Sequence, residues 1–116
     1  MTEPLTYHEA EEIFREIQSH ADKSDPDIAG IYDNLYRQAI QYANIRARWP
    51  FLPREEKMET DSRRTSLHDA FITSVNIVSR LQAEAGARWR VRLGDDRKRI
   101  GDFACFMALF FSIEAR

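Results

Sequence analysis

Six basic side chains lie within twelve residues of this sequence, between Arg88 and Arg99, and they are the groups best suited to binding chemistry. A guanidinium group pairs with a phosphate or a carboxylate through two parallel hydrogen bonds, which the ammonium group of lysine does not do. In an extended segment, alternate arginines would share one side and Trp89 would lie on the other side as a stacking platform for a base. The predicted ligand-binding residues are Arg88, Trp89, Arg90, Arg92, Arg97 and Arg99.

The same arginines can instead pair with carboxylates of the protein itself. Residues 1–44 carry nine acidic and three basic residues, a balance of −6, whereas residues 45–116 carry ten acidic and fourteen basic residues, a balance of +4. Because the two parts attract each other, internal pairing of the Arg-rich segment 88–99 is the favoured interpretation. Contact with nucleic acid or with a nucleotide phosphate is the alternative. No Gly-rich phosphate loop, zinc-ligand set or helix-turn-helix pattern accompanies it.

A second place where chemistry is conceivable is the adjacent pair His68 and Asp69. Helical phosphohydrolases of the HD class bind metal ions through a separated His, an adjacent His-Asp pair and a later Asp. Neighbouring residues on a helix point about 100° apart, so both side chains reach one ion only with special geometry. The interpretation without a functional role is a polar pair that binds no metal. A metal-dependent phosphohydrolase that uses His68 and Asp69 is the second alternative function. The other ligands would come from His8, His20, Asp95, Asp96 and Asp102.

No nucleophile of the kind used in covalent catalysis stands out in the sequence. Ser66, Ser74 and Ser79 lack the context of an activated serine, and the single Cys105 lies in an apolar run where a thiolate is costly. We therefore expect no catalytic residue and no cofactor.

The elements that would position these residues are helices, because apolar residues recur at helical spacing along most of the chain. Thr6 and Glu9 form a capping box, and the run Ser24-Asp25-Pro26 is a second start signal. Gly86 is a natural helix end, and Gly94-Asp95-Asp96 opens the last helix. The sequence predicts an all-α, four-helix bundle-like single domain over residues 1–116. Its predicted helices span about 7–22, 26–48, 62–85 and 95–115.

Two segments between these helices have weaker patterns. Residues 54–64 are charged and poor in apolar residues, which predicts a loop or an exposed helical extension. Residues 87–93 alternate with a period of two, yet no partner strand is apparent. Since a lone strand is unstable, the alternation predicts an extended connector.

The last predicted helix is apolar on every side from Phe103 to Ile113. A surface helix has one apolar stripe, so an all-round apolar helix is either central to the bundle or shared with a second chain. The small residues Gly101, Ala104 and Ala108 would allow close approach on one side of it. The sequence predicts this helix as the central hydrophobic element of the bundle. Because three short partner helices offer limited cover, it also predicts a homodimer through Phe103–Ile113.

Overall composition limits the class of protein. The 116 residues carry a net charge of −2, which gives no bulk attraction to nucleic acid or to a membrane surface. One cysteine cannot form an internal disulfide, and the first residues do not resemble a signal peptide. The longest apolar run is shorter than the roughly 20 residues that span a bilayer. These features predict a cytoplasmic protein with no membrane segment.

Two segments of the C-terminal half stand out, Ser-Leu-His-Asp-Ala-Phe at 66–71 and Gly-Asp-Asp-Arg-Lys-Arg-Ile-Gly-Asp-Phe-Ala-Cys at 94–105. Through them, residues 64–116 resemble a family of small uncharacterised bacterial proteins, a domain of unknown function. The resemblance implies a bacterial origin and an autonomous domain, and it implies no activity. The function that the sequence favours is a non-enzymatic protein-interaction or regulatory module that binds a protein partner.

Overall fold

The computed structural model describes residues 3–114, and every regular element within that range is helical. The all-α prediction is therefore confirmed, while the number of α-helices is five and not four. The elements are α1 Tyr7–Ser19, α2 Pro26–Arg48, the short 3₁₀ helix η1 Trp49–Phe51, α3 Arg54–Leu81, α4 Ala83–Leu93 and α5 Arg97–Glu114.

The first two helices begin where the sequence indicates. Thr6 Oγ1 accepts a hydrogen bond from the backbone N–H of Glu9 at 3.1 Å, and a carboxylate oxygen of Asp25 accepts one from the N–H of Asp27 at 2.8 Å. Each contact satisfies a backbone donor that the first turn of a helix leaves free. Helix α2 matches its predicted bounds, whereas α1 ends at Ser19, earlier than predicted.

Helix α3 begins earlier than the predicted residue 62, because residues 54–64 form the exposed helical extension that was one of the two predictions for this segment, and not a loop. Pro53 stands immediately before its first turn, and Glu55 and Glu56 lie within that turn, at the positive end of the helix dipole. The guanidinium of Arg64 stacks 3.9 Å from the ring centre of Trp49, so this charged stretch is held against the end of α2 and η1. A polar sequence thus becomes a helix because a neighbouring element supports it.

The prediction of an extended connector is wrong, because residues 87–93 belong to helix α4. The chain turns at Ala83, whose φ of 55° lies in the left-handed region, and α4 then folds back beside α3. Gly86 does not end a helix. A Cβ at that position would lie 1.9 Å from the carbonyl oxygen of Ser79, so only glycine permits this approach. Gly86, Trp89 and Leu93 are the buried residues of α4, and their spacing of three and four is helical.

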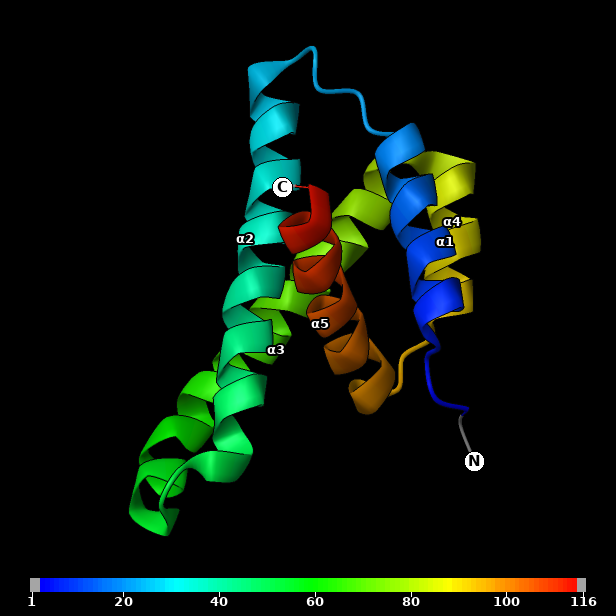
Figure 1. Ribbon diagram of the computed structural model, residues 1–116. Helices are drawn as coiled ribbons and strands as arrows, with labels where there is room; N and C mark the ends of the chain where they lie inside the picture. The colour runs from blue at the N-terminus through cyan, green and yellow to red at the C-terminus, as the bar shows by residue number, and fades with distance from the viewer. Residues whose placement is uncertain (1–2, 115–116) are drawn as a thin grey trace.

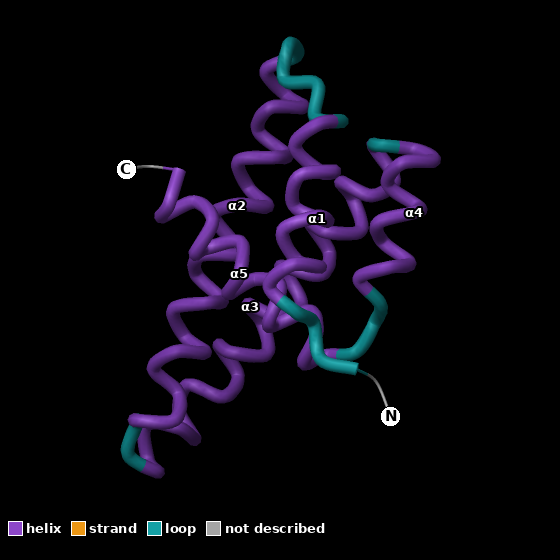
Figure 2. Tube along the Cα trace, turned by 45° about the vertical axis from the view of Figure 1, so that its right-hand side comes forward, coloured by secondary structure: helices purple, strands orange, loops and turns teal. Residues whose placement is uncertain are grey.

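The helices form two groups around a shared core. Helices α2 and α3 run antiparallel, and their joined ends project beyond the other helices as an arm, which we define as residues 46–64 (Figure 1). Helix α5 packs along α2, while α1 and α4 lie side by side at the other side of the molecule (Figures 1 and 2). The largest fully buried side chains come from all five α-helices and include Phe14, Tyr32, Phe71, Trp89 and Phe103.

Helix α5 is covered mainly by helices of its own chain. Phe103 and Met107 are fully buried, and Phe110 stacks on Phe14 of α1 with ring centres 5.1 Å apart. Leu109 and Ile113 keep 45% and 50% of their surface exposed. Within the described residues, no helix is long and apolar enough to cross a membrane.

Candidate functional site

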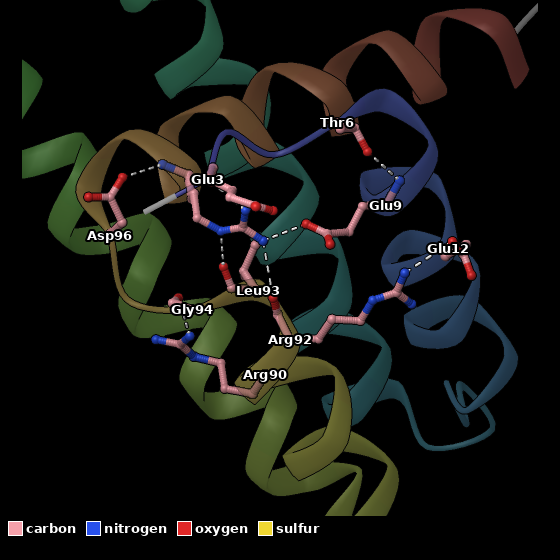
Figure 3. Close-up of polar contacts among 10 residues, drawn as sticks. Glu3, Thr6, Glu9, Glu12, Arg90, Arg92, Leu93, Gly94 and Asp96 are labelled. Carbon is pink, nitrogen blue, oxygen red and sulfur yellow. Dashed lines mark hydrogen bonds and ion pairs between the residues drawn. The ribbon is translucent and has the colours of Figure 1, made fainter. Parts of the chain in front are cut away.

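The Arg-rich segment 88–99 is folded into the protein at its most buried member, Arg99. This side chain is only 8% exposed, and its guanidinium donates to the carbonyl oxygens of Leu93 at 2.8 Å, Glu3 at 2.7 Å and Arg92 at 3.1 Å. It also donates to the carboxylate of Glu9 on α1 (Figure 3). A buried charge is tolerated only with such a full set of partners, so Arg99 fixes the turn between α4 and α5 against α1.

Arg90 and Arg92 also bond within the chain. Arg90 donates to the backbone oxygen of Gly94, to the side-chain amide oxygen of Asn76 and to the carboxylate of Asp95, each at 2.7 Å. Arg92 donates to Glu12 of α1 at 3.0 Å (Figure 3). The hydrogen bond from Arg92 lowers the pKa of the Glu12 carboxyl. Arg92 and Arg99 therefore make the contacts with the acidic first helix that the charge asymmetry favours.

Trp89 is not available as a stacking platform, because its side chain is fully buried. Its indole Nε1 donates to Gln82 Oε1 at 2.9 Å, and the amide of Gln82 in turn donates to Ile17 O and Tyr32 Oη at 2.8 and 2.9 Å. Arg88 and Arg97 are exposed, on different helices. The predicted binding residues therefore do not form one surface.

The residues suggested for a metal site are also dispersed. His68 is buried, with its Nδ1 3.3 Å from Asp69 Oδ1 and its ring against Tyr42. Asp95 pairs with Arg90, and Asp102 pairs with basic side chains. Within residues 3–114, no three His, Cys, Asp or Glu side chains lie close enough together to hold a metal ion. The geometry gives the phosphohydrolase alternative no support.

A different set of basic residues does converge. A pocket of about 220 Å³ lies between α2, α3 and the start of α5. Four of its lining residues are cationic and the fifth is an aromatic alcohol. We call it the basic pocket, and its residues are Tyr42, Arg46, Arg64, Arg97 and Lys98.

Asp102 of α5 joins two of these cations. Its Oδ1 accepts from Arg46 Nη1 at 3.1 Å, and its Oδ2 accepts from Lys98 Nζ at 2.9 Å. Gly101 provides the space for this arrangement, since a Cβ there would lie 2.7 Å from Cζ of Arg46. The guanidinium of Arg46 thus packs against the backbone of α5 while it bonds to the next residue along.

Arg64 is held from the other side of the basic pocket. Trp49 lies under its guanidinium plane, and Asp61 accepts a hydrogen bond from its Nη2 at 3.2 Å. Its Nε is buried and has no hydrogen-bond partner among the described residues. Stacking on an aromatic ring fixes the plane of a guanidinium and leaves its edge free for a planar or tetrahedral anion.

The charges in the basic pocket do not cancel. Four cations face two bonded carboxylates, Asp61 and Asp102, which leaves an excess of two positive charges. Burial raises the pKa of the Tyr42 hydroxyl, and the charges of Arg46, Arg97 and Arg64 act against that rise. Three guanidinium groups therefore exert their field on one buried oxygen, and an anion in the pocket would experience the same field.

Most residues of the basic pocket are not recognisable from the sequence, because they come from distant parts of the chain. Only Arg97 was among the predicted binding residues. Arg46 and Arg64 belong to different helices, and only the antiparallel packing of α2 and α3 brings them together. A usable signal was the glycine at 101, which has no role in a turn and sits within a helix.

Comparison of the chain with protein-family models, with curated proteins and with solved structures gave no match.

Proposed function

We propose that this protein binds a phosphate-bearing ligand in the basic pocket. The observation that carries the proposal is the excess of two positive charges, held on three helices around a space of about 220 Å³. A terminal phosphate carries about −1.5 to −2 charge at neutral pH and accepts several hydrogen bonds, which matches this excess. Like charges repel each other. The fold nevertheless holds four cations together with only two carboxylates bonded to them, and this favours a binding site for an anion.

This proposal corresponds to the nucleic-acid or nucleotide-phosphate alternative of the sequence analysis, with a different set of residues. A protein-interaction module remains a prediction, but the Arg-rich segment is a poor contact surface for it, because Arg99 and Trp89 are buried. A carboxylate of a protein partner would fill the pocket with a single charge and would leave one cation without compensation.

The direct test is a titration of the protein with inorganic phosphate, in which calorimetry or NMR of the arginine side chains measures the binding. We expect saturable binding that weakens by about tenfold in Arg97→Ala and in Lys98→Ala, because each removes a charge-assisted hydrogen bond. Arg88→Ala is the matched control, since it removes one exposed arginine outside the pocket. Binding that is absent, or that all three variants weaken equally, would exclude a specific phosphate site.

A homodimer through α5 is a separate proposal. Leu109 and Ile113 are the half-exposed apolar residues of this helix, and Tyr7 of α1 lies beside its Phe106, with ring centres 5.9 Å apart. Sedimentation of the wild type and of Leu109→Asp tests it. A monomer at high concentration would show that the chain itself provides all the cover that α5 needs.

A further inference from the structure

The two sides of α3 in the arm differ in net charge. Arg54, Lys57, Asp61 and Arg64 are spaced by three and four residues, which places them on one side of a helix. Glu55, Glu56 and Glu59 fall on the opposite side together with Arg63, so that side is negative in balance while the first set is positive. The first set continues from Arg64 of the basic pocket toward the end of the arm. We call Arg54, Lys57 and Arg64 the basic row.

The basic row is longer than a single phosphate requires. Ten residues separate Arg54 from Arg64, which is about 15 Å along an α-helix at 1.5 Å per residue. Each strand of a DNA duplex carries a phosphate about every 3.4 Å along the helix axis, so the length of the row corresponds to roughly four phosphates at that spacing. The arm projects from the rest of the molecule, and a linear ligand can therefore lie along it (Figure 1).

An exposed aromatic ring stands at the end of the arm. Phe51 in η1 is 87% exposed, and Arg54, the first residue of the basic row, follows it by three positions. A side chain of this kind on a solvated tip contributes little to folding. Proteins that bind single strands combine a track of cations with aromatic rings on which bases stack.

The net charge of −2 does not oppose such a ligand, because the excess of acidic residues lies outside the arm. Residues 3–33 contain nine acidic and two basic residues, and they form α1 and the start of α2, away from the arm (Figure 1). The molecule therefore has an acidic end and a basic arm. Such a separation orients an approaching polyanion toward the arm.

We propose that the phosphate recognised by the basic pocket belongs to a single-stranded nucleic acid, whose backbone follows the basic row and one of whose bases stacks on Phe51. This inference rests on the proposed function, since the basic pocket would hold one phosphate of the strand. The row of cations extends the contact to neighbouring phosphates.

The test compares the binding of inorganic phosphate, measured by calorimetry, with the binding of labelled oligothymidylates of increasing length. Fluorescence anisotropy at several salt concentrations measures the binding of the oligothymidylates. We expect affinity to rise with length up to about six nucleotides and to fall with salt, with a logarithmic slope of about 2 or steeper. Phosphate that binds while longer strands bind no more tightly overturns this inference and leaves the proposed function intact. Failure of both ligands to bind overturns both.

Matched variants locate the strand on the arm. The double variant Arg54→Ala/Lys57→Ala should weaken a six-nucleotide strand about tenfold or more and leave inorganic phosphate unchanged. Arg80→Ala/Arg88→Ala removes the same charge from exposed positions outside the row, and it should have a much smaller effect. Equal weakening by the two double variants would show charge attraction without a defined track, and it would overturn the inference.

The role of Phe51 has its own control on the arm. Phe51→Ala should weaken strand binding roughly five- to hundredfold, as loss of a stacking ring does. Met58→Ala removes another exposed apolar side chain, 73% exposed, and should leave binding unchanged. A duplex of the same length that binds as tightly as the strand, or a Phe51→Ala variant that binds normally, would overturn the single-strand assignment.

Discussion

The guanidinium of Arg46 on α2 lies 3.1 Å from the carboxylate of Asp102 on α5, and both side chains are about three-quarters buried. This pair joins two helices that are distant in the sequence and holds a cation at the edge of the basic pocket. The contact is therefore both structural and electrostatic. Variants that change one property more than the other separate these roles.

Replacing Asp102 by asparagine tests the structural role. Asp102→Asn keeps an acceptor for Arg46 but removes the charge that also holds Lys98, so we expect the free energy of unfolding to fall by about 1–2 kcal/mol. Urea denaturation at neutral pH measures it. Asp61→Asn makes the same change in a more exposed pair, with Arg64, and should cost less than about 0.5 kcal/mol. Equal losses in the two variants would contradict a larger contribution of Asp102 than of Asp61 to the free energy of unfolding.

Gly101→Ala tests the positioning of Arg46 apart from charge. The added methyl group would lie 2.7 Å from Cζ of Arg46, so the end of this flexible side chain must move away from α5. Alanine favours a helix over glycine by up to about 1 kcal/mol, which offsets the lost contact. We expect stability to change by less than about 1 kcal/mol, while phosphate affinity falls several-fold.

Gly30→Ala is the matched control for that change. It lies within α2, and a Cβ there meets nothing within 4 Å. We expect it to raise the free energy of unfolding by about 0.5–1 kcal/mol and to leave phosphate affinity unchanged. An unchanged affinity in Gly101→Ala as well would mean that the position of Arg46 does not matter for the ligand.

Trp89→Phe tests the inner position of a residue that the sequence places on a binding surface. The indole fills the core and donates to Gln82, so the change leaves a small void and an oxygen without its donor. We expect a loss of about 2–4 kcal/mol in the free energy of unfolding. Arg88→Ala, the exposed neighbour, should stay within about 0.5 kcal/mol of the wild type. Similar small effects in both would restore the surface interpretation of Trp89.

Local signals predicted the starts of the first two helices, because the caps at Thr6 and Asp25 depend on neighbouring residues alone. The region of α4 was misassigned for a different reason. Its arginines alternate with Trp89 and Val91 as in a strand, yet its buried residues Gly86, Trp89 and Leu93 follow helical spacing. Which residues are buried depends on α1 and α3, and no local pattern contains that information.

The candidate site shows the same limit at longer range. Internal pairing of the Arg-rich segment followed from the charge asymmetry of the two halves, and the contacts of Arg92 with Glu12 and of Arg99 with Glu9 agree with it. The basic pocket depends on how α2, α3 and α5 cross. The packing of these helices brings Arg46 and Arg97 to the same pocket, and no local stretch of the sequence indicates that they are neighbours.

The pH dependence of stability tests the packing of Tyr36, a residue of α2, against the end of α5. Its ring lies 4.4 Å from that of Phe111, and burial, followed by the effects of Tyr32, Glu114 and Asp33, raises the pKa of its hydroxyl from near 10 to about 12. The folded state therefore keeps its proton where the unfolded state loses it. Stability from this group is fully present below pH 10 and is lost as pH rises through 12.

The measurement is the urea midpoint of the wild type and of Tyr36→Phe between pH 8 and pH 11. Both proteins lose stability at high pH because other groups ionise, so the difference between them isolates Tyr36. We expect the wild type to lose more stability above pH 10 than Tyr36→Phe, which has no hydroxyl to ionise. Parallel curves would show that the Tyr36 hydroxyl is as accessible to solvent in the folded protein as in the unfolded chain.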